Sequence, residues 1–440
     1  MRRLPHAAAR GRTLTLDLEG KAVPALEGEP LAAALVAAGE DVFCRAAEDG
    51  LPRGAYCFAA LCGQCRMRVD GIDGVFTCRT PARAGMRLAR QDASARRALE
   101  TLAWILPRER QGGGPLDEPG LARIVGELVG MGMLPEGAPP PLLPARELKT
   151  CVAVVGGGAA GLAAVSVLGA RGLPFLLFEQ EAHIGGRLRS GAPEPEAPEL
   201  LDPGTLPSSS LRRGCTAVGL HEDAAGRYLL VLAIEPVGLR LTKVYAERFL
   251  LTAGSVPAAP PFARGGLPGV YAGRALSLLA RVYGVAPEAV VLTGWGAELY
   301  ALARLLAGAG TAVRGIVDLR GPLPADAPAV ACVASDPEVH GEGAVTAFSF
   351  TPRGAALRRL ECEVLAVCVP PQPSVELARQ GDARVACADA GGAPCVQVDS
   401  EGRTSATDLF AAGELTGAVD ARAAAEAGRC AAEAIVRELR

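Results

Sequence analysis

Histidine is rare in this chain of 440 residues, which contains only four: His6, His183, His221 and His340. Their positions match neither the spacing of zinc ligands nor that of a Ser-His-Asp arrangement. His183, which lies two residues before a Gly-Gly pair, is the only one to follow, and a surface or loop position is its simpler explanation. Hydrolytic triads and histidine-based zinc sites are therefore not expected.

Long hydrophobic runs and an excess of one charge sign are also missing. No run of about 18 apolar residues occurs, and the basic start, MRRLPHAAARGRTL, lacks the apolar stretch of a signal peptide. The net charge is −3 with both signs interspersed, apart from an arginine run over 79–97 that reads as a solvated face or a partner-docking patch. We expect a soluble, cytoplasmic protein that neither spans a membrane nor binds nucleic acid.

Cysteine is too sparse for a disulfide scaffold, because thirteen cysteines are spread over 440 residues. No CxxxxC motif follows Gly185-Gly186, and no CxxC motif lies within 289–318, so disulfide-reductase chemistry is not expected. Nine cysteines lie outside the motif described next and are expected to be reduced, mostly in the core.

Four cysteines form a motif in the segment RGAYCFAALCGQCRMRVDGIDGVFTCRTP, namely Cys57, Cys62, Cys65 and Cys78. The pattern CxxxxCxxC followed by a later cysteine is typical of plant-type [2Fe-2S] ferredoxins. Gly63 would let the backbone approach the inorganic sulfides closely. A structural zinc site and thiols that merely fill a core are the alternatives, but zinc sites usually pair their ligands as two CxxC-type knuckles. The motif predicts four cluster ligands and one-electron chemistry.

The surroundings of these cysteines predict a small ferredoxin-like β-grasp domain. A strand at 66–69, a turn at 70–74 and a returning strand at 75–77 form a hairpin that would carry Cys78 to the second iron. Upstream, the apolar patterns predict two paired strands and a helix, at 13–18, 21–26 and 30–38.

A second motif, TCVAVVGGGAAGLAAVSVLGARGLPFLLFEQ, reads as strand, glycine turn, helix and strand over 150–180. Gly156, Gly158 and Gly161 would permit the tight turn, the approach of a pyrophosphate and close helix-strand packing. The helix that begins near Ala159 would offer its N-terminus to the phosphates. Glu179 ends the second strand, near the distance at which an acid binds ribose hydroxyls. The alternative is a glycine-rich turn of an ordinary α/β domain.

Three further segments resemble those of two-dinucleotide-binding flavoproteins. They are Gly185-Gly186-Arg187, the strand and turn AERFLLTAGSVPAAPPF from Ala246, and TSATDLFAAGEL from Thr404, in which Glu414 would reach the ribityl chain. A helix that begins near Asp420 would aim its N-terminus at the flavin. The residues expected to contact the cofactor are Gly156, Gly158, Ala159, Ala160, Gly161, Glu179, Gly186, Arg187, Ala253, Gly254, Gly413 and Glu414.

Residues 289–318 form a second dinucleotide-like unit that departs from the motif. Gly294 and Gly296 are present, but Leu299 stands at the third glycine position and Trp295 fills the turn. A leucine there should push the helix from the strand, and an indole would obstruct a pyrophosphate, although Asp318 could still hold a ribose. We expect a degenerate nicotinamide domain, with NAD(P)H binding left open.

The length and the motifs together predict a multidomain α/β chain with two Rossmann-like domains of the glutathione-reductase type after the β-grasp domain. The predicted segments are a [2Fe-2S] domain at 1–95, a helical and Pro/Gly-rich linker at 96–148, FAD-binding parts at 149–280 and 386–440, and the degenerate NAD(P)-binding-like domain at 281–385.

This order of domains resembles the FAD and [2Fe-2S] accessory subunits of heteromeric amine and amino-acid dehydrogenases. The family includes hydrogen cyanide synthase, opine oxidases, hydroxyproline and proline dehydrogenases and the alpha subunit of sarcosine oxidase. The resemblance covers nearly all of 11–440 and implies a partner subunit whose own FAD oxidises a C–N bond, with an additional small iron-sulfur subunit as a further candidate partner. Many relatives continue with a second iron-sulfur or folate module, whose function would here be absent or lie on another polypeptide.

The same resemblance leaves the cofactor partly open, because some relatives hold ATP or NAD in the first dinucleotide site or FMN at a subunit interface. No residue set in the sequence looks like a substrate base, so catalytic residues are not assigned and an electron-transfer role is favoured. A self-contained NAD(P)H-dependent reductase and an assembly subunit with a structural nucleotide are the alternatives. The substrate, the electron acceptor and the subunit stoichiometry are not predicted.

Overall fold

The computed structural model describes residues 1–5, 11–46, 49–92, 142–190, 207–235, 238–387, 392–418 and 420–440. The chain divides into two bodies, of which the first comprises 1–137 and 257–370, and the second comprises 138–256 and 371–440. The predicted helical and Pro/Gly-rich linker lies outside the described residues as far as residue 141.

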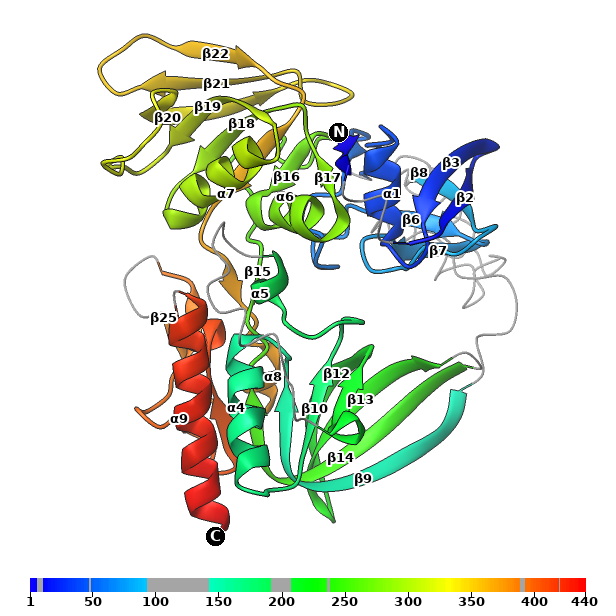
Figure 1. Cartoon of the computed structure of the whole chain (residues 1–440), viewed down its shortest axis with the longest axis vertical. Coiled ribbons are helices and arrows are strands. Elements are labelled where there is room, and N and C mark those ends of the chain that lie inside the picture. The colour runs from blue at the N-terminus through cyan, green and yellow to red at the C-terminus, as the bar shows by residue number, and fades with distance from the viewer. Residues whose placement is uncertain are drawn as a thin grey trace, which may run out of the picture. The chain divides into compact units, whose positions relative to one another are not determined.

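The first body begins with a β-grasp-like domain (Figure 1). Its sheet has the order β3-β2-β8-β4-β5, while β6 pairs with β8 and β7. In β2, Leu14, Leu16 and Leu18 are buried and alternate with more exposed residues, as the period-2 pattern predicts. The elements are β2 (Thr13–Leu18), β3 (Lys21–Leu26), α1 (Leu31–Ala37), β4 (Cys44–Arg45), β5 (Pro52–Arg53), β6 (Arg66–Val69), β7 (Ile72–Phe76) and β8 (Arg87–Asp92).

The hairpin of this domain differs from the prediction in its turn. β7 begins at Ile72, so Asp70 and Gly71 alone connect the strands, with φ values of 49° and 87°. Two successive residues with positive φ are the signature of a tight two-residue hairpin turn, for which Asp-Gly is a favoured pair. The predicted five-residue turn was therefore wrong.

The rest of the first body is a Rossmann-like domain. Its sheet has the order β16-β23-β18-β19-β20-β21-β22, parallel from β16 to β20 and antiparallel thereafter. Its elements are β16 (Val270–Ala272), α6 (Gly273–Leu278), η4 (Leu279–Tyr283), β17 (Val285–Ala286), β18 (Ala289–Gly294), α7 (Ala297–Gly308), β19 (Ala312–Asp318), β20 (Ala331–His340), β21 (Ala347–Pro352), β22 (Arg358–Glu361) and β23 (Leu365–Cys368).

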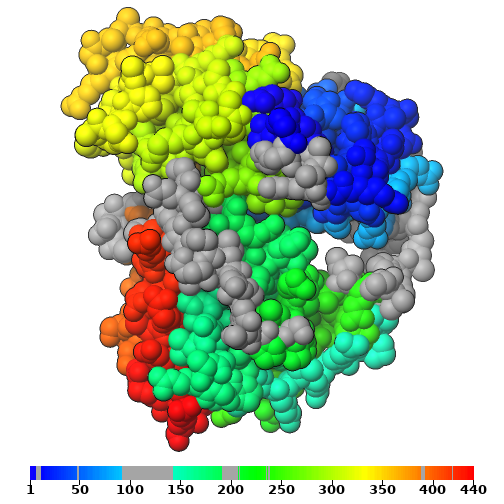
Figure 2. Space-filling view, viewed as in Figure 1, coloured from blue at the N-terminus to red at the C-terminus, as the bar shows by residue number. Residues whose placement is uncertain are grey.

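These two domains share one hydrophobic core. The N-terminal strand β1 (Arg2–Arg3) pairs with β17 of the Rossmann-like domain, and the backbone N–H of Leu4 donates to Gly284 O at 2.8 Å. Buried side chains from both domains, among them Leu16 and Leu276, belong to the same cluster. Figure 2 shows the blue surface of the first domain directly against the green and yellow surface of the second.

The second body is built on one seven-stranded sheet. Its sheet has the order β11-β10-β9-β14-β13-β12, with β27 also beside β14, and β10, β9, β14 and β27 are parallel. Helices α4 and α9 pack together over one face (Figure 1). The sheet strands are β9 (Leu142–Val155), β10 (Phe175–Glu179), β11 (Leu211–Arg213), β12 (Cys215–Asp223), β13 (Gly226–Glu235), β14 (Gly238–Leu251) and β27 (Leu409–Ala411).

The remaining elements of this body are short apart from its two main helices. They are α4 (Ala159–Ala170), α5 (Arg187–Ser190), η3 (Ser208–Ser210), β15 (Ser255–Val256), β24 (Gln372–Pro373), α8 (Glu376–Gln380), β25 (Val385–Cys387), β26 (Pro394–Val396), η5 (Glu414–Thr416) and α9 (Ala421–Leu439). The predicted multidomain α/β fold class is confirmed. Within the described ranges, no helix is both long and apolar enough to cross a membrane.

Candidate functional site: a cysteine loop and a dinucleotide cradle

The four motif cysteines lie around one loop of the β-grasp domain, three of them before β6 and the fourth after β7. Cys57, Cys65 and Cys78 are at most 3 % exposed, and Cys62 is partly exposed. The thiols interact as two pairs, Cys57 with Cys62 and Cys65 with Cys78. Among described residues, no three His, Cys, Asp or Glu side chains converge as ligands of a single ion. Two pairs of thiols fit a two-iron cluster, in which each iron takes two cysteines.

The loop backbone is bent toward the first thiol. Phe58, Ala60 and Gly63 have φ values of 51°, 54° and 71°, a region that non-glycine residues seldom adopt. The N–H groups of Ala59 and Cys62 donate to Cys57 Sγ at 3.3 and 3.5 Å. Hydrogen bonds from the Cys62 thiol and from these amides lower the pKa of Cys57 below its ordinary value. Because metals bind the thiolate form, this surrounding suits a ligand cysteine.

Residues outside the motif hold the loop in place. Thr77 Oγ1 donates to Cys65 O at 2.7 Å, and Arg66 Nε donates to Gly63 O at 2.8 Å. Cys44, a buried cysteine from β4, donates its thiol to Gln64 O at 3.2 Å. The sequence interpretation missed Thr77 and Cys44, and only the position of Thr77 directly before Cys78 could have drawn attention to it.

The predicted dinucleotide residues gather in the second body where its parallel strands end. β9, β10, β14 and β27 end at Val155, Glu179, Leu251 and Ala411, and the predicted residues lie at these ends or in the segments that follow them. Ligands of open α/β sheets bind at this carboxyl edge. The structure thus brings four segments that are distant in sequence to one place.

The three motif glycines have different surroundings. Gly156 has a φ of 104°, and an added Cβ would lie 2.3 Å from Thr252 O. A Cβ on Gly161 would lie 1.9 Å from Gly156 O, so helix α4 can approach strand β9 only with glycine there. Beside Gly158, the N-cap of α4, nothing lies within 4 Å of an added Cβ. The open position is the one at which a pyrophosphate would approach.

The first residues of α4 set the approach of the neighbouring elements. Ala160 is 5 % exposed, and Cβ atoms added to Gly413 and Gly428 would meet Ala160 atoms at 2.9 and 2.1 Å. Ala159, the first residue of the helix, is partly exposed. Small residues therefore let α4 and α9 cross closely beneath the site. Gly186, with φ 46°, would bring a Cβ to 3.2 Å from Gly158 Cα, so the Gly-Gly turn lies directly against the glycine loop.

Two acidic residues lie beside the dinucleotide cradle, by which we mean the glycine loop 156–161 and the turns at 185–186 and 253–254. Glu179 is 7 % exposed, and its carboxylate accepts from the N–H groups of Gly157 and Glu181, each at 2.8 Å. Glu414, at the start of η5, forms an ion pair with Arg187 and accepts a hydrogen bond from Ser255 Oγ. Ser255 was missed in the sequence, where it stands one residue after the predicted Ala253-Gly254 pair. That pair follows β14, and a Cβ on Gly254 would lie 3.9 Å from Glu414 Oε2.

The described histidines do not form a cluster. His183 is largely exposed. Its pKa is lowered mainly by the partial burial of the ring and further by the charges of Arg189 and Arg213. His221 packs against the ring of Tyr228, with centroids 5.8 Å apart, and His340 Nε2 lies 2.8 Å from Ser349 Oγ. His6 lies outside the described residues.

The comparisons with known proteins agree with this arrangement. A 2Fe-2S iron-sulfur cluster binding domain family matches 11–93, and an NAD(P)-binding Rossmann-like domain family matches 154–205. L-proline dehydrogenase from P. horikoshii is similar in structure, with a TM-score of 0.72 and 19% identity over 100% of this chain and 76% of its own. Thioredoxin reductase from T. acidophilum has a TM-score of 0.52 and 17% identity over 66% of this chain and 99% of its own. No curated protein matches in sequence.

The family matches support a [2Fe-2S] cluster in the β-grasp domain and a dinucleotide in the second body. The four thiols in two pairs and the open space at Gly158 fit those groups. The chain thus combines a domain of the 2Fe-2S cluster-binding type with a Rossmann-like domain, in a fold similar to those of L-proline dehydrogenase and thioredoxin reductase.

Proposed function

We propose that the chain is the flavin and [2Fe-2S] electron-transfer subunit of a heteromeric dehydrogenase that oxidises the C–N bond of a small amine or amino acid. A partner flavoprotein would take two electrons from the substrate as hydride and pass them to this chain. The structural likeness to L-proline dehydrogenase is the main support, because it extends over 100% of our chain, including the iron-sulfur domain.

The side chains around the cradle suit electron transfer better than substrate oxidation. The Glu414 carboxylate is engaged by Arg187 and Ser255, and Glu179 accepts two backbone hydrogen bonds, so neither acid is poised as a substrate base. When bound, a flavin takes up an electron pair and releases electrons singly, and a [2Fe-2S] cluster carries one electron at a time.

The chain's own residues would serve to bind and orient these groups. Gly158 leaves room for a pyrophosphate at the N-terminus of α4, where the helix dipole favours negative charge. Glu179 would hold the ribose, and Gly254 with Glu414 would adjoin the ribityl chain. Cys57, Cys62, Cys65 and Cys78 would bind the cluster through their two thiol pairs.

The proposal is tested by purifying the chain anaerobically, alone and with an amine-oxidising flavoprotein encoded beside it. We expect candidate amino acids such as L-proline to reduce the flavin and the cluster of the complex, and to leave the isolated chain oxidised. A matched complex with Cys62→Ser should still bleach its flavins but lack the cluster signal in electron paramagnetic resonance.

Two results would overturn the proposal in different ways. If NADH or NADPH bleaches the flavin of the isolated chain within seconds, the chain is a self-contained reductase. If the chain's cofactors stay oxidised while the partner turns over substrate, the chain is an assembly subunit with a structural nucleotide.

A further inference from the structure

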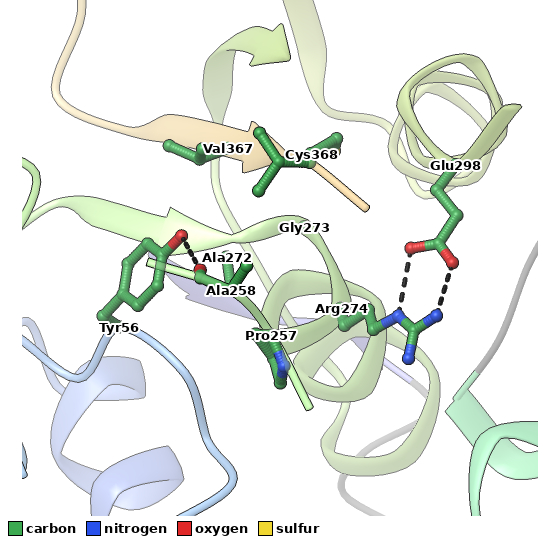
Figure 3. Close-up of a pocket in the computed structure, with 10 residues that line it drawn as sticks. Tyr56, Pro257, Ala258, Ala272, Gly273, Arg274, Glu298, Val367 and Cys368 are labelled. Atoms are coloured by element: carbon green, nitrogen blue, oxygen red, sulfur yellow. Dashed lines mark hydrogen bonds and ion pairs between the residues drawn. The ribbon is translucent and has the colours of Figure 1, made fainter. Parts of the chain in front are cut away.

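The ligand crevice of the Rossmann-like domain in the first body is filled by side chains of this protein. In this fold a dinucleotide lies at the carboxyl ends of the strands where the strand order reverses, here between β18 and β23. A small pocket remains there (Figure 3). It is lined by both domains of the body, through Tyr56, Pro257, Ala258, Ala272, Gly273, Arg274, Glu298, Val367, Cys368 and Val369.

The place of a pyrophosphate, at the N-terminus of α7, holds a carboxylate. Glu298 lies in the first turn of α7 and forms a bidentate ion pair with Arg274, in which Nη2 and Nε donate to the two carboxylate oxygens at 2.7 and 3.1 Å. A carboxylate here already satisfies the helix dipole and would repel a phosphate. Beside it, the guanidinium of Arg320 covers the Trp295 ring, 4.1 Å from its centroid. An ion pair thus lies in the first turn of α7 and a stacked indole directly before its N-cap, while Gly296, the N-cap itself, has nothing within 4 Å of an added Cβ.

The acidic residue at the end of β19 also has hydrogen-bond partners within the protein. Asp318 is 3 % exposed, and its carboxylate accepts from Tyr300 Oη at 2.8 Å and from the N–H groups of Arg320 and Gly321 at 2.9 and 2.7 Å. A ribose hydroxyl would have to compete with the Tyr300 hydroxyl for this carboxylate.

The third wall of the crevice comes from the iron-sulfur domain. Tyr56, which directly precedes the cluster ligand Cys57, is 2 % exposed, and its hydroxyl donates to Ala258 O at 2.9 Å (Figure 3). Its carbonyl accepts from the N–H of Ala272, the last residue of β16, at 3.0 Å. Both ends of Tyr56 are thus bonded to the Rossmann-like domain.

Other contacts make this attachment close. The N–H of Gly54 donates to Gly266 O at 3.1 Å, and a Cβ on Gly54 would lie 2.8 Å from Pro268 Cα. Tyr271 Oη donates to Asp41 Oδ1 at 2.8 Å. Backbone contacts this close leave no room for water between the domains at Gly54.

We propose that the Rossmann-like domain of the first body binds the iron-sulfur domain in place of a nicotinamide dinucleotide, and that Tyr56 is the positioning residue that ties the cluster loop to it. The cluster is then carried on a fixed platform formed by the first body. This inference concerns the platform alone and holds for any substrate of the proposed dehydrogenase.

The positioning role is tested with Tyr56→Phe against the matched control Tyr271→Phe, in the full chain with its cofactors. Each variant loses one buried hydroxyl from the same contact, but only Tyr56 adjoins a cluster ligand. We expect Tyr56→Phe to shift the g-values of the reduced cluster and to speed cluster loss to an iron chelator about fivefold, the equivalent of one lost hydrogen bond of about 1 kcal/mol. Tyr271→Phe should change neither. Equal effects of the two variants, or none from Tyr56→Phe, would overturn the role.

The exclusion of dinucleotide is tested by fluorescence. The chain has two tryptophans, so Trp104→Phe leaves Trp295, directly before the N-cap of α7, as a single reporter. We expect NADH and NADPH at millimolar concentration to produce no saturable energy transfer from Trp295. Saturable transfer at micromolar NADH would refute the inference. This signal reports binding and not turnover, so its outcome is independent of whether the proposed dehydrogenase function holds.

Discussion

Gly161 and Gly158 stand three residues apart in one loop, yet the structure predicts opposite consequences for the same substitution. A Cβ on Gly161 would lie 1.9 Å from Gly156 O and 2.8 Å from Thr252 Oγ1, whereas one on Gly158 meets nothing within 4 Å. Gly161→Ala should therefore damage the fold itself. Gly158→Ala should leave the fold intact and obstruct only the ligand.

The magnitudes follow from what each methyl group meets. Overpacking a rigid site costs about 1–3 kcal/mol, and the helix preference for alanine returns at most about 1 kcal/mol. Because the atom that Gly161→Ala would strike is a backbone oxygen, we expect a net loss of about 2 kcal/mol. At Gly158, φ is −83°, a value that alanine adopts freely. Alanine is a poorer N-cap than glycine, but it also lowers the entropy of the unfolded chain, and the two effects offset each other. The free energy of unfolding of Gly158→Ala should therefore stay within about 0.5 kcal/mol of that of the natural chain.

Urea unfolding of the cofactor-free chain and FAD titration separate the two effects. Both variants should bind FAD at least about tenfold more weakly, which corresponds to about 1.4 kcal/mol. Only Gly161→Ala should lower the free energy of unfolding. If Gly158→Ala unfolds as readily as Gly161→Ala, or binds FAD as tightly as the natural chain, our account of the cradle is wrong.

Three other predictions concern the cluster, the domain contact and the flavin acid. Cys62→Ser should abolish the cluster's visible absorbance, whereas Cys44→Ser, which alters a thiol that only supports the loop, should retain it; equal loss in both would contradict the ligand assignment. Burial raises the pKa of Asp41 above 3.8, so the protonated carboxyl stabilises the folded state at acid pH, and this contribution is lost as pH rises through the folded pKa. Thermal melts of Asp41→Asn should therefore show its stability increasing relative to that of the natural chain toward neutral pH. A stability difference that does not change with pH would count against this prediction. Glu414→Gln removes the ion pair to Arg187 and should weaken FAD retention by about 1 kcal/mol, given the partial exposure of the pair; unchanged FAD content per chain would disprove that role.

Local spacing explains why much of the fold could be predicted. The strands at 13–18 and 21–26 and the helix that follows Asp420 were predicted correctly, because the apolar period and the capping residue are short-range signals. The tight Asp70-Gly71 turn was missed because 70–74 holds two glycines, and alternation alone did not show which of them begins the returning strand.

Contacts between distant residues account for what could not be predicted. Thr252 Oγ1 donates to Val155 O across a sequence separation of 97 residues, and Ser255 reaches Glu414 across 159. Each of these side chains is ordinary in its own segment. Their roles arise only because parallel strands end at one edge of a sheet.

The sequence by itself determined the donor atoms and the glycines of this protein: four thiols at ferredoxin spacing and a strand-turn-helix with room for a pyrophosphate. These signals are local, since a ligand loop and a glycine turn are made of consecutive residues. The tertiary structure alone decided how the thiols pair, that Glu298 and Arg274 fill the second crevice, and that Tyr56 closes it. Those outcomes depend on how side chains pack in three dimensions, and for Tyr56 on the packing of two domains, which no spacing along the chain records.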